Sequence, residues 1–78
     1  MTVQAYILVQ TEIGTAGDVT QAIGAIPGVT LAEDVTGPYD VIVRAEAATM
    51  DDLGRQILGR IQQVPGITRT LTCPVVHL

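Results

Sequence analysis

Residues 34–44 read DVTGPYDVIVR. Two β-type runs, residues 29–36 and 39–46, meet in this stretch, and Gly37-Pro38 separates them. Proline removes a ladder donor, and glycine accepts backbone angles that other residues avoid, so the pair predicts a tight turn. Asp40 follows this turn directly, at the mouth of an apolar strand. A carboxylate at this position is usually solvated, but it can also bind the ammonium group of a ligand by accepting its hydrogen bonds. The stretch therefore predicts a β-hairpin with a candidate binding group at its base.

The chain before this hairpin predicts a strand followed by a helix. Residues 3–10 are apolar on nearly both faces, as expected of a central strand covered twice. Thr15 is a candidate N-cap, with Asp18 three residues on as a carboxylate variant of the capping box. Apolar residues at helical spacing predict a helix over residues 16–26, which Pro27-Gly28 ends.

The chain after the hairpin repeats this pattern. We expect a cap at Thr49 with Asp52, a helix over residues 50–64 ended by Pro65-Gly66, a fourth strand over residues 67–73 and a tail over residues 74–78. The segment IGAIPGVT of residues 23–30 also recurs as IQQVPGIT of residues 61–68.

Two similar βαβ halves joined by a hairpin predict an α+β fold of the ferredoxin-like βαββαβ type. Right-handed crossovers place both helices on one face of a four-stranded antiparallel sheet. The other face is left bare, and we expect it to carry Tyr6, Leu8 and Ile42 among polar residues and the threonines of the fourth strand. Large exposed apolar residues usually mark an interface, so this face predicts a homodimer through the sheets, a dimeric α/β barrel.

Length and composition indicate one small domain, residues 1–78, in need of partners. A monomer of 78 residues buries only about 60% of its unfolded surface. One cysteine excludes an internal disulfide, no Cys/His cluster offers a metal site, and we expect no metal and no cofactor. No apolar run reaches the ~18 residues of a membrane span, and Met1 leads straight into a strand without a basic segment. The chain therefore predicts a cytoplasmic protein without a signal peptide or a membrane partner.

Direct nucleic-acid binding is not expected. The net charge is −4, and the only cations besides the N-terminus are four isolated arginines. Phosphate recognition needs a clustered positive field, which four separate arginines do not supply.

The hairpin and its flanks resemble a known family. The segment from Asp34 to Val43 is similar to the V-T-G-x-Y/F-D hairpin of the effector-binding (RAM) domain in the Lrp/AsnC, or feast/famine, regulators. The flanks agree, because a helix leads into I-P-G-V at residues 26–29 and another into V-P-G-I-T-R-T at residues 64–70. The resemblance runs from about Val3 to Val76. The helix-turn-helix that binds DNA in this family has no counterpart in the 78 residues, so the chain resembles the stand-alone effector domains.

The resemblance implies a partner set and a site. Family members dimerise through their sheets, assemble further into rings, and bind small effectors, typically amino acids, in clefts between dimers near the hairpin. Carried over by position, the ligand-binding residues are Gly37, Tyr39 and Asp40, with Thr68, Thr70 and Thr72 as a less specific addition. Full-length Lrp/AsnC regulators are implied as further partners.

Each of these residues also has an ordinary structural explanation. Asp40 can hold the turn or pair with a surface arginine. Gly37 fits the turn geometry, Tyr39 fits packing with its hydroxyl on water, and the threonines are common β-formers on a half-buried face.

The chemistry of an amino-acid effector agrees with the hairpin site. An α-amino acid presents an ammonium and a carboxylate together. Asp40 can accept from the ammonium in a charge-assisted bond, and backbone N–H groups around Gly37 or threonine hydroxyls can donate to the carboxylate. We therefore expect a non-catalytic module for effector binding and oligomerisation, which modulates transcription through full-length relatives without binding DNA itself.

Two other functions stay open on the residues alone. One is a small dimeric ferredoxin-like enzyme of the monooxygenase or isomerase type. It would need a titrating group in its pocket, for which the chain offers Tyr6, Tyr39, Asp40 and His77, and no nucleophile–base pair or other catalytic residue is evident. The other is a structural or metal-binding protein, although one histidine and one cysteine are few ligands. The residues name neither the effector nor the ring size.

Overall fold

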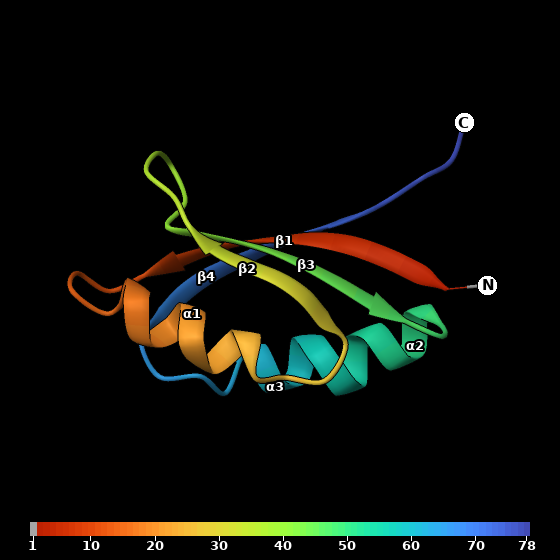
Figure 1. Cartoon of the computed structure of the whole chain (residues 1–78), viewed down its shortest axis with the longest axis horizontal. Coiled ribbons are helices and arrows are strands. Elements are labelled where there is room, and N and C mark those ends of the chain that lie inside the picture. Colours follow the sequence, from red (N-terminus) through yellow and green to blue (C-terminus); the bar gives the residue numbers. More distant parts are fainter. Residues whose placement is uncertain (1) are drawn as a thin grey trace.

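The computed structural model describes residues 2–78 and has the predicted order of elements (Figure 1). Its strands are β1 (Val3–Thr11), β2 (Val29–Asp34), β3 (Val41–Ala47) and β4 (Ile67–Pro74). Its helices are α1 (Ala16–Gly24) and a continuous helical run made of α2 (Met50–Asp52), the π-helical segment η1 (Leu53–Leu58) and α3 (Gly59–Ile61). The βαββαβ prediction is confirmed.

The four strands form one antiparallel sheet in the order β2-β3-β1-β4, so the first strand lies in the interior and the last at an edge. Both helical segments lie on the same side of this sheet (Figure 1). The core fills the space between the two layers and consists of alternate residues of β1 and β3 with one stripe from each helix. Its members are Ala5, Ile7, Val9, Val19, Ile23, Ile26, Val41, Val43, Ala45, Leu53, Ile57 and Ile61.

The second helical run differs from the prediction of a single helix over residues 50–64. It ends at Ile61, and its middle is π-helical. The buried residues Leu53, Ile57 and Ile61 recur at a constant spacing of four. An α-helix turns once in 3.6 residues, so this spacing drifts around its axis, whereas the wider π turn keeps the three side chains closer to one line.

The two helix starts are capped differently. The Thr49 hydroxyl accepts from the Asp52 N–H at 3.1 Å, as the sequence predicts. Thr15 occupies the N-cap position of α1, as predicted, but its side chain makes no capping bond, so the predicted capping box with Asp18 is wrong. Its hydroxyl instead donates to the Glu12 carbonyl at 2.7 Å, which fixes the β1–α1 connection rather than the helix.

The repeated Pro-Gly turns have the same geometry. Gly28 and Gly66 each adopt φ of +97°, a region that disfavours side chains. A Cβ on Gly28 would lie 2.9 Å from the Glu46 carbonyl, and one on Gly66 would lie 2.8 Å from the Thr15 hydroxyl. Both turns therefore require glycine for backbone shape and for space.

Within residues 2–78, the structure has no helix that is long and apolar enough to cross a lipid bilayer.

Candidate functional site

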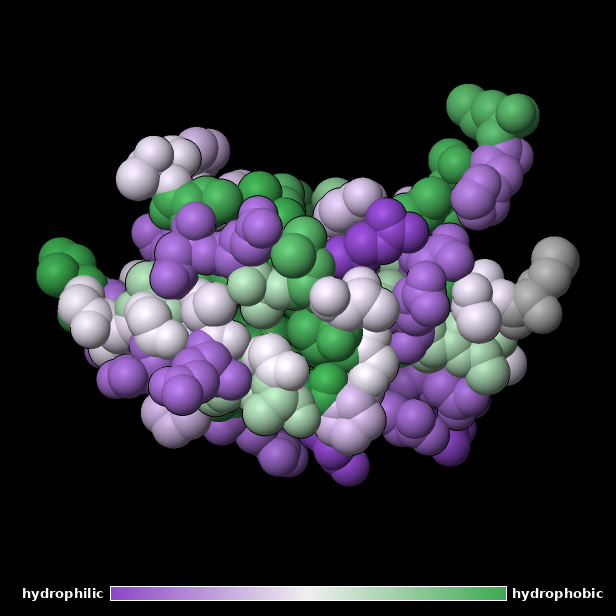
Figure 2. Space-filling model, in the orientation of Figure 1, coloured by the Kyte–Doolittle hydropathy of each residue, from purple (hydrophilic) through white to green (hydrophobic). Residues whose placement is uncertain are grey.

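The sheet face opposite the helices is uncovered. It carries large apolar side chains together with polar ones, and Tyr6 and Leu71 are 39% and 43% exposed. The strand pairings place on this face Gln4, Tyr6, Leu8, Gln10, Leu31, Glu33, Ile42, Arg44, Glu46, Arg69, Leu71 and Cys73. In Figure 2 apolar groups lie along the edge of the molecule away from the helices.

The fourth strand faces the opposite way from the prediction. Thr70 and Thr72 pair with Val9 and Ile7, whose side chains are buried under the helices. Directly paired residues of an antiparallel ladder share a face, so these threonines lie on the covered side and Leu71 on the uncovered one. Thr68 lies where the ladder shifts register, between the pairs Gln10–Arg69 and Thr11–Ile67. The orientation of β4 follows from its pairing register with β1, and the sequence of β4 by itself does not predict it.

The β2–β3 hairpin is closed by three contacts at its base and tip. The Val35 N–H donates to the Asp40 carbonyl and the Asp40 N–H to the Val9 carbonyl, both at 2.9 Å. The Gln10 side-chain amide donates to the Pro38 carbonyl at 2.9 Å. Gly37 has φ of +140° with nothing within 4 Å of a Cβ built on it, so glycine is needed here for the turn and leaves its surroundings open.

The Asp40 carboxylate ties the hairpin to the end of β1. Its Oδ2 accepts from the Thr11 N–H at 2.8 Å and from the Thr11 hydroxyl at 3.3 Å. Within the described chain, Asp40 Oδ1 accepts no hydrogen bond. The side chain thus has a structural partner on one oxygen and one oxygen left for a further donor. Thr11 was missed by sequence reasoning, because its role arises only when β1 and the hairpin lie side by side.

An apolar hollow of about 390 Å³ lies at the foot of the hairpin, on the uncovered face. We call it the hairpin hollow, and its lining residues are Leu8, Val35, Thr36, Pro38, Tyr39 and Ile42. Leu8 and Ile42 are paired across β1 and β3 and form its floor, while the loop rises over them. The structure therefore brings Tyr39 into a cavity, near Gly37 and Asp40, and leaves Thr70 and Thr72 on the other face.

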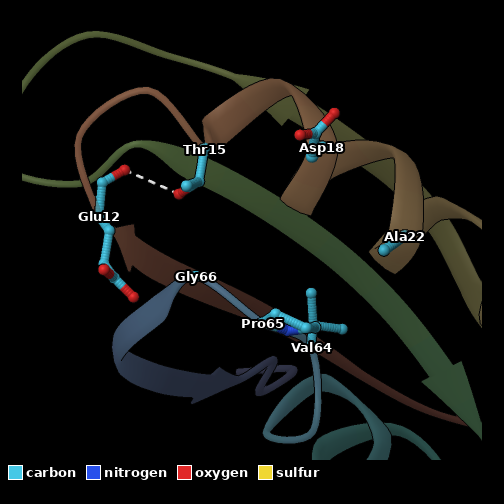
Figure 3. A pocket seen from close by; sticks show the side chains of 7 residues that line it. All are labelled: Glu12, Thr15, Asp18, Ala22, Val64, Pro65 and Gly66. Carbon is cyan, nitrogen blue, oxygen red and sulfur yellow. Dashed lines mark hydrogen bonds between the residues drawn. The ribbon is translucent and has the colours of Figure 1, made fainter.

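A second hollow, of about 490 Å³, lies between α1 and the turn into β4 (Figure 3). Ala22, Val64 and Pro65 give it apolar walls, and Glu12 and Asp18 lie at its rim. Figure 3 shows the two carboxylates pointing away from one another. The rim is held by a bond from the Glu12 N–H to the Gly66 carbonyl at 2.7 Å. Two exposed, separated carboxylates do not make a cation site.

The charged residues of the uncovered face are unpaired within residues 2–78. The Arg44 guanidinium donates to the Tyr6 hydroxyl at 3.0 Å and lies 5.3 Å from the centre of its ring. Neither Arg44 nor Arg69 has a carboxylate partner in the described chain, where the one ion pair joins Arg55 and Asp51 on the helical run. The same residues contain no group of three or more potential metal ligands.

Residues 4–77 match the family described as the Lrp/AsnC ligand binding domain. A homocitrate synthase of Sulfurisphaera tokodaii is 38% identical to the chain over 58 residues, and an uncharacterized HTH-type transcriptional regulator of Pyrococcus furiosus is 28% identical over 58 residues. The matched segments are 74% of this chain but only 12% and 39% of those two proteins, so the chain spans less than half the length of either.

The fold is shared with solved structures. A hypothetical protein of Pyrococcus horikoshii superposes with a TM-score of 0.88 at 36% identity, over 97% of this chain and 92% of that chain. A transcriptional regulator of Neisseria meningitidis, solved as a complex with L-Met, superposes with a TM-score of 0.82 over 96% of this chain and 50% of that chain. Its identity is 19%, which shows likeness of fold alone.

Proposed function

Because the chain belongs to the family of Lrp/AsnC ligand-binding domains, we propose that it is a non-catalytic regulatory module which binds a free amino acid at its β2–β3 hairpin. The observation that carries this proposal is that only one of the two carboxylate oxygens of Asp40 accepts hydrogen bonds within the described chain. Two bonds from Thr11 fix its orientation through Oδ2, and Oδ1 remains for the ammonium of an effector. A preoriented carboxylate loses little freedom on binding, so the charge-assisted bond contributes more to affinity.

The hairpin also supplies donors for the effector carboxylate. Within the described chain, the backbone N–H groups of Thr36, Gly37 and Tyr39 donate to no protein acceptor. Gly37 leaves open space on its Cα, so a carboxylate can approach the backbone closely. The threonines of β4 are not equal candidates, because Thr70 and Thr72 lie on the covered face and only Thr68, at the register shift, remains exposed.

The proposed module acts as a dimer that pairs through the uncovered sheet face, and dimers associate further into a ring in which the hairpins of neighbouring dimers form the effector cleft. Tyr6, Leu31 and Leu71 are exposed on this face and would lose contact with water on pairing. A single small domain offers little concave surface, so a cleft completed by a neighbouring copy suits a small ligand.

Catalysis is not part of the proposal. Tyr6 bonds to Arg44, and His77 lies in the C-terminal segment. Only Tyr39 and Asp40 lie together, in the hairpin, and Asp40 already accepts two bonds from Thr11. The likeness to homocitrate synthase concerns 12% of that enzyme. A segment of this size fits an attached control unit better than a catalytic domain.

The likeness to an HTH-type regulator supports the last part of the proposal, that the module modulates transcription by assembling with full-length relatives. Co-expression with a tagged helix-turn-helix relative from the same cell tests it. Retrieval of mixed oligomers supports the role, and strict self-assembly of both chains contradicts it.

Native mass spectrometry with each of the twenty amino acids tests effector binding. We expect an even-numbered assembly whose mass increases by one or more ligands with at least one amino acid. A dimer that gains no mass with any of them would refute the amino-acid proposal and leave the fold unaffected.

Two substitutions at Asp40 separate its structural role from the proposed binding role. Asp40→Asn keeps an oxygen that accepts from the Thr11 N–H but loses the charge, so we expect nearly unchanged stability and about 10- to 100-fold weaker effector binding, measured by calorimetry. Asp40→Ala also removes the Thr11 bonds and should lower stability by about 1–3 kcal/mol. Full effector affinity in Asp40→Asn would contradict the role of the carboxylate.

A further inference from the structure

The C-terminal segment, Val75–Leu78, projects from the sheet with the side chains of Val76 and Leu78 in water. Val76 and Leu78 are 72% and 117% exposed. The last anchoring bond runs from the Val75 N–H to the Gln4 carbonyl at 2.9 Å, and beyond it the chain rises on the side of the sheet away from the helices (Figure 1). In Figure 2 this end of the molecule carries a green apolar tip. Nothing else in the described chain covers it.

The hairpin hollow has the complementary character. It is apolar, it opens on the same face of the sheet, and it lies over the pair Leu8–Ile42, toward the hairpin end of the strands. The hairpin and the C-terminal end rise from the two ends of the molecule (Figure 1). The longest dimension of the molecule is 37 Å. The segment leaves the sheet at Gln4 and continues away from the hairpin of its own chain (Figure 1), so it does not lie over its own hollow.

We propose that Val75–Leu78 of one copy occupies the hairpin hollow of a second copy, and that the exchange is reciprocal. The inference rests on the dimerisation proposed above and adds which segment seals the pair. A two-fold axis that lies between the two sheets, perpendicular to the strands, brings the Gln4 end of each sheet over the hairpin end of the other. Each C-terminal segment then stands beside the partner's hollow, which is the self-complementary contact that two-fold symmetry requires.

The charges of the uncovered face fit the same axis. Leu31, Arg44, Tyr6 and Cys73 form one row across the strands, and Glu33, Ile42, Leu8 and Leu71 form the next. An axis between these rows places Arg44 of one copy over Ile42 of the other. In that other copy Glu33 pairs with Ile42, one strand spacing of about 4.8 Å away across the sheet. Two side chains that have no ion-pair partner in the described chain thereby gain one, and Tyr6 comes to lie over Leu8.

Cross-linking between copies tests the proposed contact. In a Cys73→Ser background, Val76→Cys and Thr36→Cys place thiols on the segment and on the rim of the hollow. We expect a short bismaleimide to convert most of the protein into a covalent dimer, seen on a denaturing gel. Val76→Cys combined with Gln21→Cys is the matched control, because Gln21 is exposed on α1, on the other side of the sheet. It should give little covalent dimer.

A second variant keeps the inference falsifiable if the thiols disturb the contact. Val76→Asp should raise the dissociation constant of the dimer about tenfold or more, measured by analytical ultracentrifugation, because it places a charge in an apolar hollow. Gln62→Asp, on the exposed helical side, should leave the constant unchanged. Equal cross-linking of both cysteine pairs, no cross-linking in a chain that dimerises, or an unchanged constant in Val76→Asp would each overturn the inference.

Effector titration of the unsubstituted protein, compared with the cross-linking result, distinguishes this inference from the proposed function. Specific cross-linking in a protein that binds no amino acid supports the docked segment and refutes only the effector proposal. Amino-acid binding by a chain whose segment cross-links nowhere refutes the docked segment and leaves the effector proposal standing.

Discussion

The two faces of the same sheet are built from the same strands but differ in what they carry. On the covered face, β1 contributes Ala5, Ile7 and Val9, all at 0% exposure. On the uncovered face it contributes Tyr6 and Leu8 between glutamines, and β3 adds an arginine and a glutamate. A core excludes unpaired charges, whereas an interface mixes apolar and charged groups. The composition of the second face suits the contact with a partner copy proposed above.

The largest expected effect comes from the covered face. Ile7→Ala removes a fully buried side chain between the sheet and both helices and should lower the free energy of unfolding by about 2–5 kcal/mol. Chemical denaturation measures it, and the loss should not depend on protein concentration. A cost below about 1 kcal/mol would mean that the two faces do not differ as the burial indicates.

A smaller effect is expected for the neighbouring residue on the other face. Leu8→Ala should cost about 1 kcal/mol or less within one chain but should weaken the dimer, so the melting temperature should fall more steeply on dilution than that of the wild type. Melting curves at several concentrations measure this. Melting temperatures independent of concentration in both proteins would indicate that this face stays in water.

The smallest effect is expected for the polar contact on the uncovered face. Tyr6→Phe removes the hydroxyl that accepts from Arg44 but keeps the ring beneath the guanidinium. In a solvent-exposed setting the loss should be about 0.5 kcal/mol or less, measured by the same denaturation. A loss above about 2 kcal/mol would show that the pair is desolvated, as it would be inside a dimer.

The order of elements could be predicted because each boundary has its own local signal. Pro27-Gly28 and Pro65-Gly66 mark reversals that glycine alone fits, and Thr49 with Asp52 marks a helix start. The hairpin was predictable from Gly37-Pro38, although β2 ends two residues earlier and β3 begins two residues later than expected. Local chemistry decides such features, so no knowledge of distant residues is needed.

Features that depend on distant residues were not predictable in this way. The orientation of β4 follows from its register with β1, and alternation within TRTLTC fits either face. The Thr15 hydroxyl bonds to Glu12 because Gly66 holds that connection in place. For the candidate site, the sequence indicated Gly37, Tyr39 and Asp40, but Thr11 and the floor of the hairpin hollow come from β1 and emerge only when the sheet forms.

The bond between Val75 and Gln4 has a consequence for how such a unit can be combined with others. It holds the incoming and outgoing ends of the chain side by side, at the end of the sheet away from the hairpin. Another polypeptide fused at either end would extend from that one corner and leave the hairpin of its own chain unobstructed. The same geometry allows a module of this kind to be transplanted between host proteins in evolution, with one pair of neighbouring junctions to accommodate.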